Sequence, residues 1–149
     1  LKLYYFGQME GRRIRLPVQI RRSRPEDIQG GIQAFYEKLL QIVNEDVFHA
    51  GNWRLKEALP DGDNTHRNLL TYTWQRENEM RWVIINLGRE TGRGRVVFQD
   101  ELPEHLRYRL IDRLSGESYE QDGKLLTGPG LSLTMAGYQA QIFEISPIM

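Results

Sequence analysis

The sequence predicts a mainly β protein: an antiparallel β-sandwich of the Greek-key type, preceded by a short segment that holds a strand, a loop and a helix. Short runs rich in β-branched and aromatic residues recur along residues 53–145, separated by turns that contain Gly or Pro. Short strands spaced at roughly ten residues are typical of an antiparallel sandwich. Before them, a single segment, Ile32–Val43, has the periodicity of an amphipathic helix.

The central element of the predicted sandwich is a hairpin within Leu69–Gly88. In its first arm Leu70, Tyr72 and Trp74 alternate with residues of the other face, and a polar break at residues 76–79 closes the hairpin. The second arm, Trp82–Leu87, is almost continuously apolar, as expected of a strand that is covered on both faces. Because an isolated hairpin is only marginally stable in water, these arms are expected at the centre of a larger sheet.

The N-terminal part is predicted to be a separate segment. Leu1–Phe6 reads as a short buried strand, and residues 7–31 are irregular because Gly and Pro interrupt them. The apolar residues of Ile32–Val43 form a single stripe, which is expected to face a core. We therefore predict two parts, residues 1–46 and a sandwich over residues 47–149.

The remaining strands are predicted from alternation and from turn signals. Asp122-Gly123 is the best short hairpin signal, since both central positions of a type I′ turn need positive φ. It is expected to join strands at residues 118–120 and 124–126. The other expected strands are Trp53–Leu59, Arg95–Phe98, Tyr108–Asp112, Leu131–Met135 and Tyr138–Ile145.

Composition narrows the classes of function. The 149 residues carry 20 basic and 20 acidic side chains, so no global field favours nucleic acid or an anionic membrane as a partner. The absence of cysteine excludes disulfides and thiol catalysis and fits a reducing compartment such as the cytoplasm. No apolar run approaches the roughly 20 residues of a membrane-spanning helix. The apolar opening at Leu1 has neither the charged region nor the cleavage site of a signal peptide.

No catalytic constellation is evident. The three histidines, His49, His66 and His105, lie far apart without metal-ligand spacing, and phosphate-binding and nucleophile motifs are absent. Neighbouring carboxylates occur only in polar loops. Glycoside hydrolysis needs two carboxyl groups that face each other at roughly 5 to 9 Å, which adjacency in sequence does not show. We therefore expect no catalytic residue, no metal site and no cofactor in this chain.

Two features of the sequence are compatible with a binding function. Trp53, Trp74 and Trp82 could stack on sugar rings, although a Trp in such strands more often belongs to the core. The arginine-rich segment Arg12–Arg24 could bind a protein partner, although charge runs are more often solvated surface. A carbohydrate-binding module and a protein-interaction domain are therefore alternatives to a purely structural role.

Several stretches, in order, resemble the C-terminal region of the α-amylase family, glycoside hydrolase family thirteen. Leu3–Gln8 (LYYFGQ) is similar to the last strand of the family's barrel, although the acid that follows comes one residue late, at Glu10. Residues 35–40 (FYEKLL) resemble the final barrel helix, and residues 48–53 (FHAGNW) the segment after it. YTWQRE at residues 72–77 followed by WVIINL at residues 82–87 resembles a signature of the family's C-terminal β-domain, and residues 110–119 and 131–145 its closing strands.

This resemblance implies a TIM-type catalytic barrel upstream, on which the sandwich would pack. The three catalytic carboxylates of the family lie before the last barrel strand, so none has a counterpart here, and the same holds for the family's common calcium site. The chain alone is expected to hydrolyse nothing. The implied parent enzyme acts on α-glucans by a retaining mechanism, and self-association through the exposed apolar surface is expected in the absence of the barrel.

Overall fold

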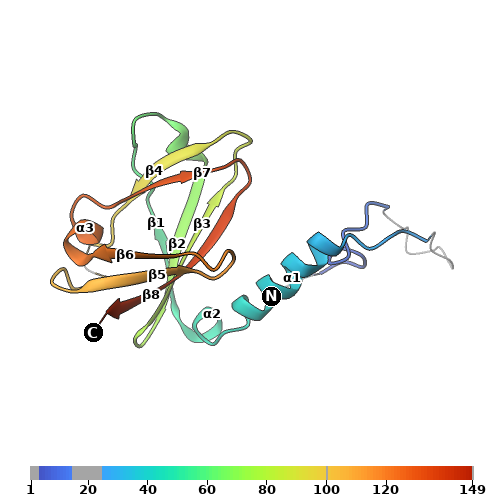
Figure 1. Cartoon of the computed structure of the whole chain (residues 1–149), viewed down its shortest axis with the longest axis horizontal. Helices are drawn as coiled ribbons and strands as arrows, with labels where there is room; N and C mark the ends of the chain where they lie inside the picture. The colour runs from blue at the N-terminus through green and yellow to red at the C-terminus, as the bar shows by residue number, and fades with distance from the viewer. Residues whose placement is uncertain (1–3, 15–24, 100, 149) are drawn as a thin grey trace. The chain divides into compact units, whose positions relative to one another are not determined.

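The computed structural model describes residues 4–14, 25–99 and 101–148 and divides the chain into two compact units, Leu1–Asn44 and Glu45–Met149 (Figure 1). The sequence placed this boundary two residues later. Glu45 and Asp46 belong to the second unit because their carboxylates form ion pairs with Arg81 and Arg76 on its central hairpin.

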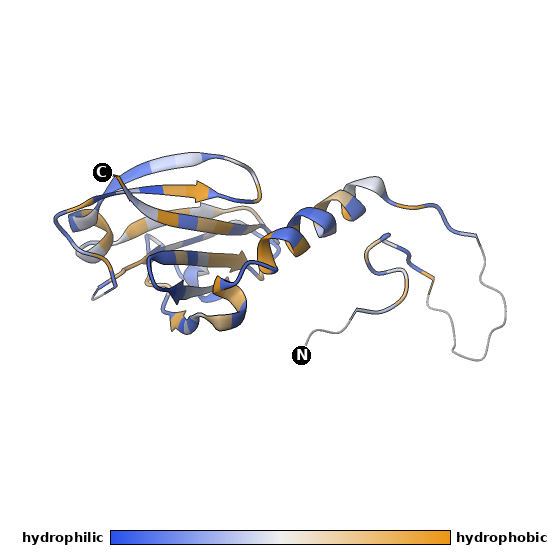
Figure 2. Ribbon diagram, turned by 90° about the horizontal axis from the view of Figure 1, so that it is seen from below, coloured by the Kyte–Doolittle hydropathy of each residue, from blue (hydrophilic) through white to orange (hydrophobic). Residues whose placement is uncertain are grey.

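The main element of the first unit is α1 (Gly30–Val43), which confirms the predicted helix. Hydrophobic and hydrophilic residues alternate along it (Figure 2). The predicted stripe is covered only in part: Ile32 and Phe35 are exposed, the other stripe residues are half-buried, and Ile42 is the buried residue of the helix. The N-terminal part of the stripe therefore lacks the cover that its periodicity predicts.

The predicted strand Leu1–Phe6 is not formed by its described residues. Residues 1–3 lie outside the described chain, and Tyr4, Tyr5 and Phe6 are exposed and lead into a series of turns that ends at Gly11. Backbone N–H and C=O groups of a strand need a neighbouring strand as hydrogen-bond partner. No described strand pairs with these residues, which is the physical reason for the difference.

The second unit is a sandwich of two antiparallel sheets, which confirms the predicted fold class (Figure 1). The larger sheet has the order β1-β2-β3-β8-β5-β6, so the C-terminal strand lies between β3 and β5. Its strands are β1 (Asn52–Lys56), β2 (Leu69–Arg76), β3 (Glu79–Asn86), β5 (Arg107–Asp112), β6 (Ser118–Asp122) and β8 (Ala140–Ile148). The smaller sheet pairs β4 (Gly92–Val96) with β7 (Leu131–Met135), and α2 (Val47–Ala50), η1 (Thr65–Asn68) and α3 (Gly123–Thr127) complete the unit.

The predicted central hairpin is confirmed as β2 and β3. The two strands pair over their full lengths, from Leu69 opposite Asn86 to Arg76 opposite Glu79. β3 pairs with β8 on its other side, so it lies inside the sheet. Its run from Met80 to Ile84 is buried, as the nearly continuous apolar sequence predicted.

The core lies between the two sheets and centres on Trp82. Its ring is fully buried, stacks on Phe143 with 5.4 Å between ring centroids, and meets Phe98 edge-on at 4.9 Å. Its indole N–H donates to the Thr71 hydroxyl at 2.6 Å, which satisfies the one polar group of the ring.

The predicted Asp122-Gly123 hairpin is wrong. Asp122 ends β6, and the following residues form the single-turn helix α3 rather than a strand. The Gly123 amide donates to the Leu106 carbonyl at 2.7 Å, and a Cβ added at Gly123 would lie 2.6 Å from the Pro103 oxygen. Gly123 is required for this close approach, and the helix brings Leu126 into the core, where it is fully buried.

Candidate functional site on the outer face of the six-stranded sheet

The larger sheet has one face that β4 and β7 do not cover, which we call the outer face. Side chains alternate across a strand, and residues 71, 73, 82 and 84 point into the core. Trp53 therefore shares the outer face with its cross-strand partner Trp74, and Leu55 shares it with its partner Tyr72. Trp53 and Leu55 are 52% and 57% exposed, and Leu70 on the same face is also exposed.

The three candidate sugar-contacting tryptophans occupy different environments. Trp82 is buried in the core, so its ring offers no face to a sugar. Trp74 is half-buried and meets Phe48 of α2 edge-on, with 6.3 Å between ring centroids. Trp53 has the most accessible ring of the three.

The Trp53 ring lies beside Tyr72, with centroids 6.0 Å apart and planes tilted by 42°. Burial raises the pKa of the Tyr72 hydroxyl, so it stays neutral throughout the physiological range. An exposed Trp ring beside a half-buried Tyr can contact either a protein surface or the C–H face of a sugar ring.

The edge strand β1 is held in place on one side by ion pairs. Glu101 Oε1 accepts from Lys56 Nζ at 2.8 Å and from Arg54 Nη1 at 3.0 Å. An uncovered edge strand is a template for pairing with other chains, and covering it with a loop reduces that hazard. These contacts tie the loop after β4 to β1.

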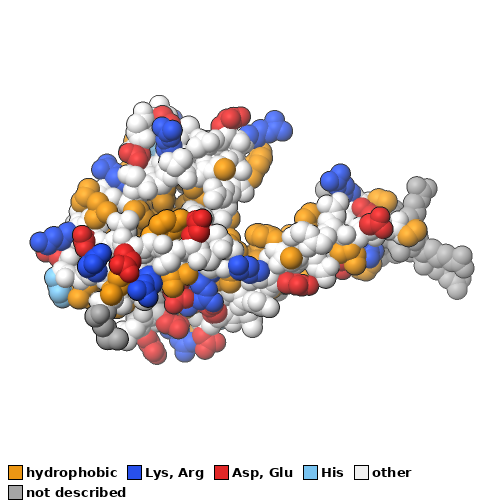
Figure 3. All heavy atoms as spheres, viewed as in Figure 1, with side chains coloured by type: hydrophobic (Ala, Val, Ile, Leu, Met, Phe, Trp, Pro, Cys, Tyr) orange, Lys and Arg blue, Asp and Glu red, His pale blue; other side chains and the backbone are white. Residues whose placement is uncertain are grey.

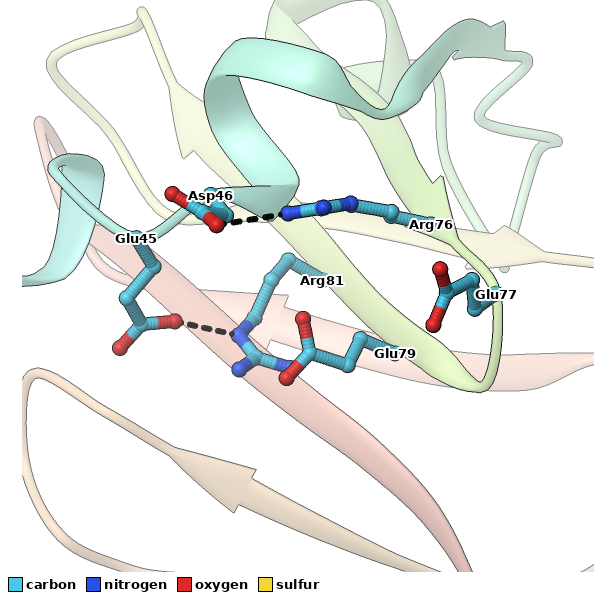
Figure 4. A pocket seen from close by; sticks show the side chains of 6 residues that line it. All are labelled: Glu45, Asp46, Arg76, Glu77, Glu79 and Arg81. Carbon is cyan, nitrogen blue, oxygen red and sulfur yellow. Dashed lines mark hydrogen bonds and ion pairs between the residues drawn. The ribbon is translucent and has the colours of Figure 1, made fainter.

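A charged pocket of about 430 Å³ lies at the turn end of the central hairpin (Figure 4). Asp46 Oδ2 accepts from Arg76 Nη1 at 2.8 Å, and Glu45 Oε2 accepts from Arg81 Nε at 2.9 Å. Both carboxylates of this adjacent pair are therefore engaged by arginines. The arrangement fixes the beginning of the second unit to the hairpin.

The ion pairs continue from this pocket across the sheet. Arg113 contacts Glu45 Oε1 at 2.9 Å and Glu144 Oε2 at 2.5 Å, and Arg81 Nη2 lies 3.8 Å from the same Glu144 oxygen. We call these four residues the Glu45 network: Glu45, Arg81, Arg113 and Glu144. Their alternating charges join the first residue of the second unit to β3, to β8 and to the residue that follows β5.

The described residues contain no cluster of three or more His, Asp or Glu side chains that could hold a metal ion. No helix in the described part of the chain is long and apolar enough to cross a membrane.

Most of the arginine-rich segment Arg12–Arg24, namely residues 15–24, lies outside the described residues. The Arg12 guanidinium lies over the Phe6 ring, 5.0 Å from its centroid.

No model of a protein family matches the chain, and no curated protein matches it. Solved structures, in contrast, do match the chain. A noncanonic maltogenic α-amylase from Thermotoga neapolitana superposes with a TM-score of 0.75 over 97% of this chain at 14% identity. The α-amylases of Geobacillus thermoleovorans, solved with acarbose, and of Anoxybacillus give TM-scores of 0.59 and 0.55 over 84% and 82% of the chain, at 18% and 17% identity.

The chain has the fold of part of an α-amylase. It spans only 32%, 25% and 24% of the length of these three α-amylases, respectively. At the level of fold, this likeness confirms the resemblance that the sequence motifs indicated.

Sequence reasoning missed two polar groups that organise this α-amylase-type sandwich. Arg81 lies in β3 directly before the apolar run, and a charged residue in a buried strand signals an ion pair. Asn86 ends β3 and is fully buried. Its amide donates to the carbonyls of Glu90, Met135 and Ala136 at 2.9 to 3.1 Å and its oxygen accepts from the Gly88 amide, so it joins β3 to the end of β7.

Proposed function

We propose that the chain is the non-catalytic C-terminal part of an α-amylase-like glycoside hydrolase that acts on α-glucans. Its sandwich would support and stabilise a catalytic barrel that belongs to the same polypeptide. The observation that carries the proposal is an apolar surface that no other described residue covers. The fold of the chain also matches only a fraction of the length of each α-amylase.

The apolar surface occurs in both units. On the sandwich it consists of Trp53, Leu55 and Leu70 on the outer face, and in the first unit of Phe35 and neighbouring residues of α1. Hydrophobic side chains are visible at the surface of both units (Figure 3). Soluble monomers rarely expose contiguous apolar patches, and such patches mark interaction sites. A barrel that packs on these residues would remove them from water.

Four carboxylates of the sandwich have structural roles, which supports a non-catalytic function. Glu45, Asp46, Glu101 and Glu144 are all engaged in ion pairs that hold elements of the sandwich together. The catalytic acid/base and nucleophile would come from the barrel. The purified chain is therefore expected to release no reducing sugar from starch.

The proposal is tested by a charge placed on the outer face. Leu55→Asp should weaken association of the chain with the polypeptide encoded immediately upstream of Leu1 by about tenfold or more, because it places a carboxylate in an apolar contact. Leu125→Asp on α3 is the matched control, since Leu125 is also exposed but lies off the outer face. Equal affinity of both variants, or an upstream polypeptide that forms no barrel, would contradict the proposal.

A second candidate function, carbohydrate binding, is favoured by the accessible ring of Trp53 beside Tyr72. Trp53→Ala should then abolish retention of the chain on immobilised starch without lowering its unfolding temperature. An equal loss of retention and stability would reject this role, because it would mark Trp53 as a residue of the fold.

A further inference from the structure

A groove of about 240 Å³ opens between the two sheets on the side away from the outer face. Four strands contribute to it, β5, β6 and β8 from the larger sheet and β7 from the smaller one. β7 pairs with β4 on one side only, so the smaller sheet ends there. The lining includes Tyr119, Gln121, Ser132, Thr134, Gln141 and Phe143.

The groove carries no charged side chain in its lining. The alternation of side chains explains this neutrality. Leu110 and its partner Tyr119 face the groove, whereas Arg109 and its partner Glu120 point to the opposite face and pair with each other at 3.3 Å. A charged ligand would therefore find no counter-ion in the groove.

Two glutamine side chains in the groove are free to form hydrogen bonds with a ligand. The side chains of Gln121 and Gln141 are half-buried, and neither forms a hydrogen bond within the described residues. The nearby Gln139 differs, because its side-chain oxygen accepts from the Ala136 amide at 2.8 Å. Each glutamine amide provides two donors and an acceptor.

An aromatic ring is held at the mouth of the groove. Tyr119 is 43% exposed, and its ring packs edge-on against Phe143 with 6.2 Å between centroids. Its hydroxyl donates to Glu117 Oε2 at 2.5 Å, and this hydrogen bond raises the pKa of Tyr119. The ring is therefore fixed at both ends and neutral.

We propose that this groove binds a short stretch of a neutral α-glucan, one or two glucose units, at a place separate from the tryptophans of the outer face. Amide groups that both donate and accept suit neighbouring sugar hydroxyls, and the Tyr119 ring suits the C–H face of a pyranose. The volume of about 240 Å³ lies below the range of about 300 to 1,000 Å³ for pockets that hold drug-sized ligands, which fits one or two sugar rings. The choice of α-linked glucose rests on the proposed function.

The test is a titration of the purified, isotope-labelled chain with maltotriose, followed by NMR. The backbone and side-chain amides of Gln121 and Gln141 should shift in a saturable way. Gln121→Ala and Gln141→Ala should each weaken binding by about fivefold or more, the effect of one lost hydrogen bond. The matched control is Gln75→Ala, which removes an exposed glutamine of β2 outside the groove and should leave both affinity and unfolding temperature unchanged.

Several results would overturn the inference. Saturable binding that is lost in Trp53→Ala but kept in Gln141→Ala would place the sugar on the outer face instead. Equal affinity for cellotriose would reject an α-glucan site, and shifts caused by a strand-forming peptide but not by maltotriose would assign the groove to a protein partner. If maltotriose does not bind in the groove but Leu55→Asp weakens association with the barrel as predicted, the proposed sugar site is wrong. The proposed supporting role of the sandwich would then still stand.

Discussion

At the scale of single residues, Asn86 shows how one buried amide can join two sheets. It ends a strand of the larger sheet, yet two of its three hydrogen-bond acceptors, the carbonyls of Met135 and Ala136, belong to the chain at the end of β7. Aspartate in its place would set a negative charge against these carbonyl oxygens. An apolar residue would leave them without a donor.

Replacing Asn86 by Ala should lower the free energy of unfolding by about 2 to 4 kcal/mol, because several buried backbone groups lose their partner. Urea unfolding followed by circular dichroism measures the change. Asn64→Ala is the control: Asn64 is exposed and its side chain does not cap the following η1, so its loss should have little effect. A similar small effect for Asn86→Ala would show that the bridge contributes little.

Replacing Trp82 and replacing Trp53 should likewise have different effects on the stability of the chain. Trp82→Ala is expected to destabilise the chain by about 3 to 5 kcal/mol, since it leaves a cavity beside Phe98 and Phe143 and an unpaired Thr71 hydroxyl. Trp53→Ala should change the unfolding temperature far less because Trp53 is about half exposed to water already. Differential scanning calorimetry of the two variants decides this, and equal losses would contradict the assignment of Trp53 to an accessible surface.

At the scale of elements, the Glu45 network explains why the second unit begins where it does. Arg81 is nearly buried, and its partners are only partly exposed, so these pairs are screened less than surface pairs. The network holds the chain at residue 45 against β3 and β8.

Arg81→Gln should therefore destabilise the chain by about 2 to 4 kcal/mol, because it leaves Glu45 and Glu144 with fewer counter-charges in a partly dry site. Arg107→Gln is the matched control, since Arg107 also pairs with two carboxylates but is largely exposed. A surface pair of that kind is worth about 0 to 1 kcal/mol. Chemical denaturation at low and high salt measures both variants; equal effects would contradict a stabilising role for the network.

Local patterns predicted some elements and failed for others for identifiable reasons. The β2–β3 hairpin and α1 were predictable because their residues alternate or repeat with the period of the element itself. α3 was not, because burial of Leu126 and the tight approach of Gly123 to the loop at Pro103 outweigh the turn preference of Asp-Gly. Arg81 and Asn86 required knowledge of which distant segments meet them.

At the scale of the whole molecule, the exposed apolar surface should cause self-association of the isolated chain. The residues concerned in the first unit include Tyr5, Phe6, Ile32 and Phe35, all exposed. Light scattering should show a mass that rises with concentration, and Ile32→Asp combined with Phe35→Asp should reduce this rise. Gln33→Asp, a polar substitution on the same helix, is the control. A monomer at high concentration would refute this prediction.

The central claim is that this chain supports catalysis elsewhere and performs none itself. The most direct measurement adds the purified chain to the polypeptide encoded upstream of Leu1 and follows starch hydrolysis as the mixture is heated. We predict that the chain alone releases no sugar and that its addition prolongs the activity of the upstream polypeptide at elevated temperature. Hydrolysis by the chain alone, or an activity half-life that its addition leaves unchanged, would contradict the claim.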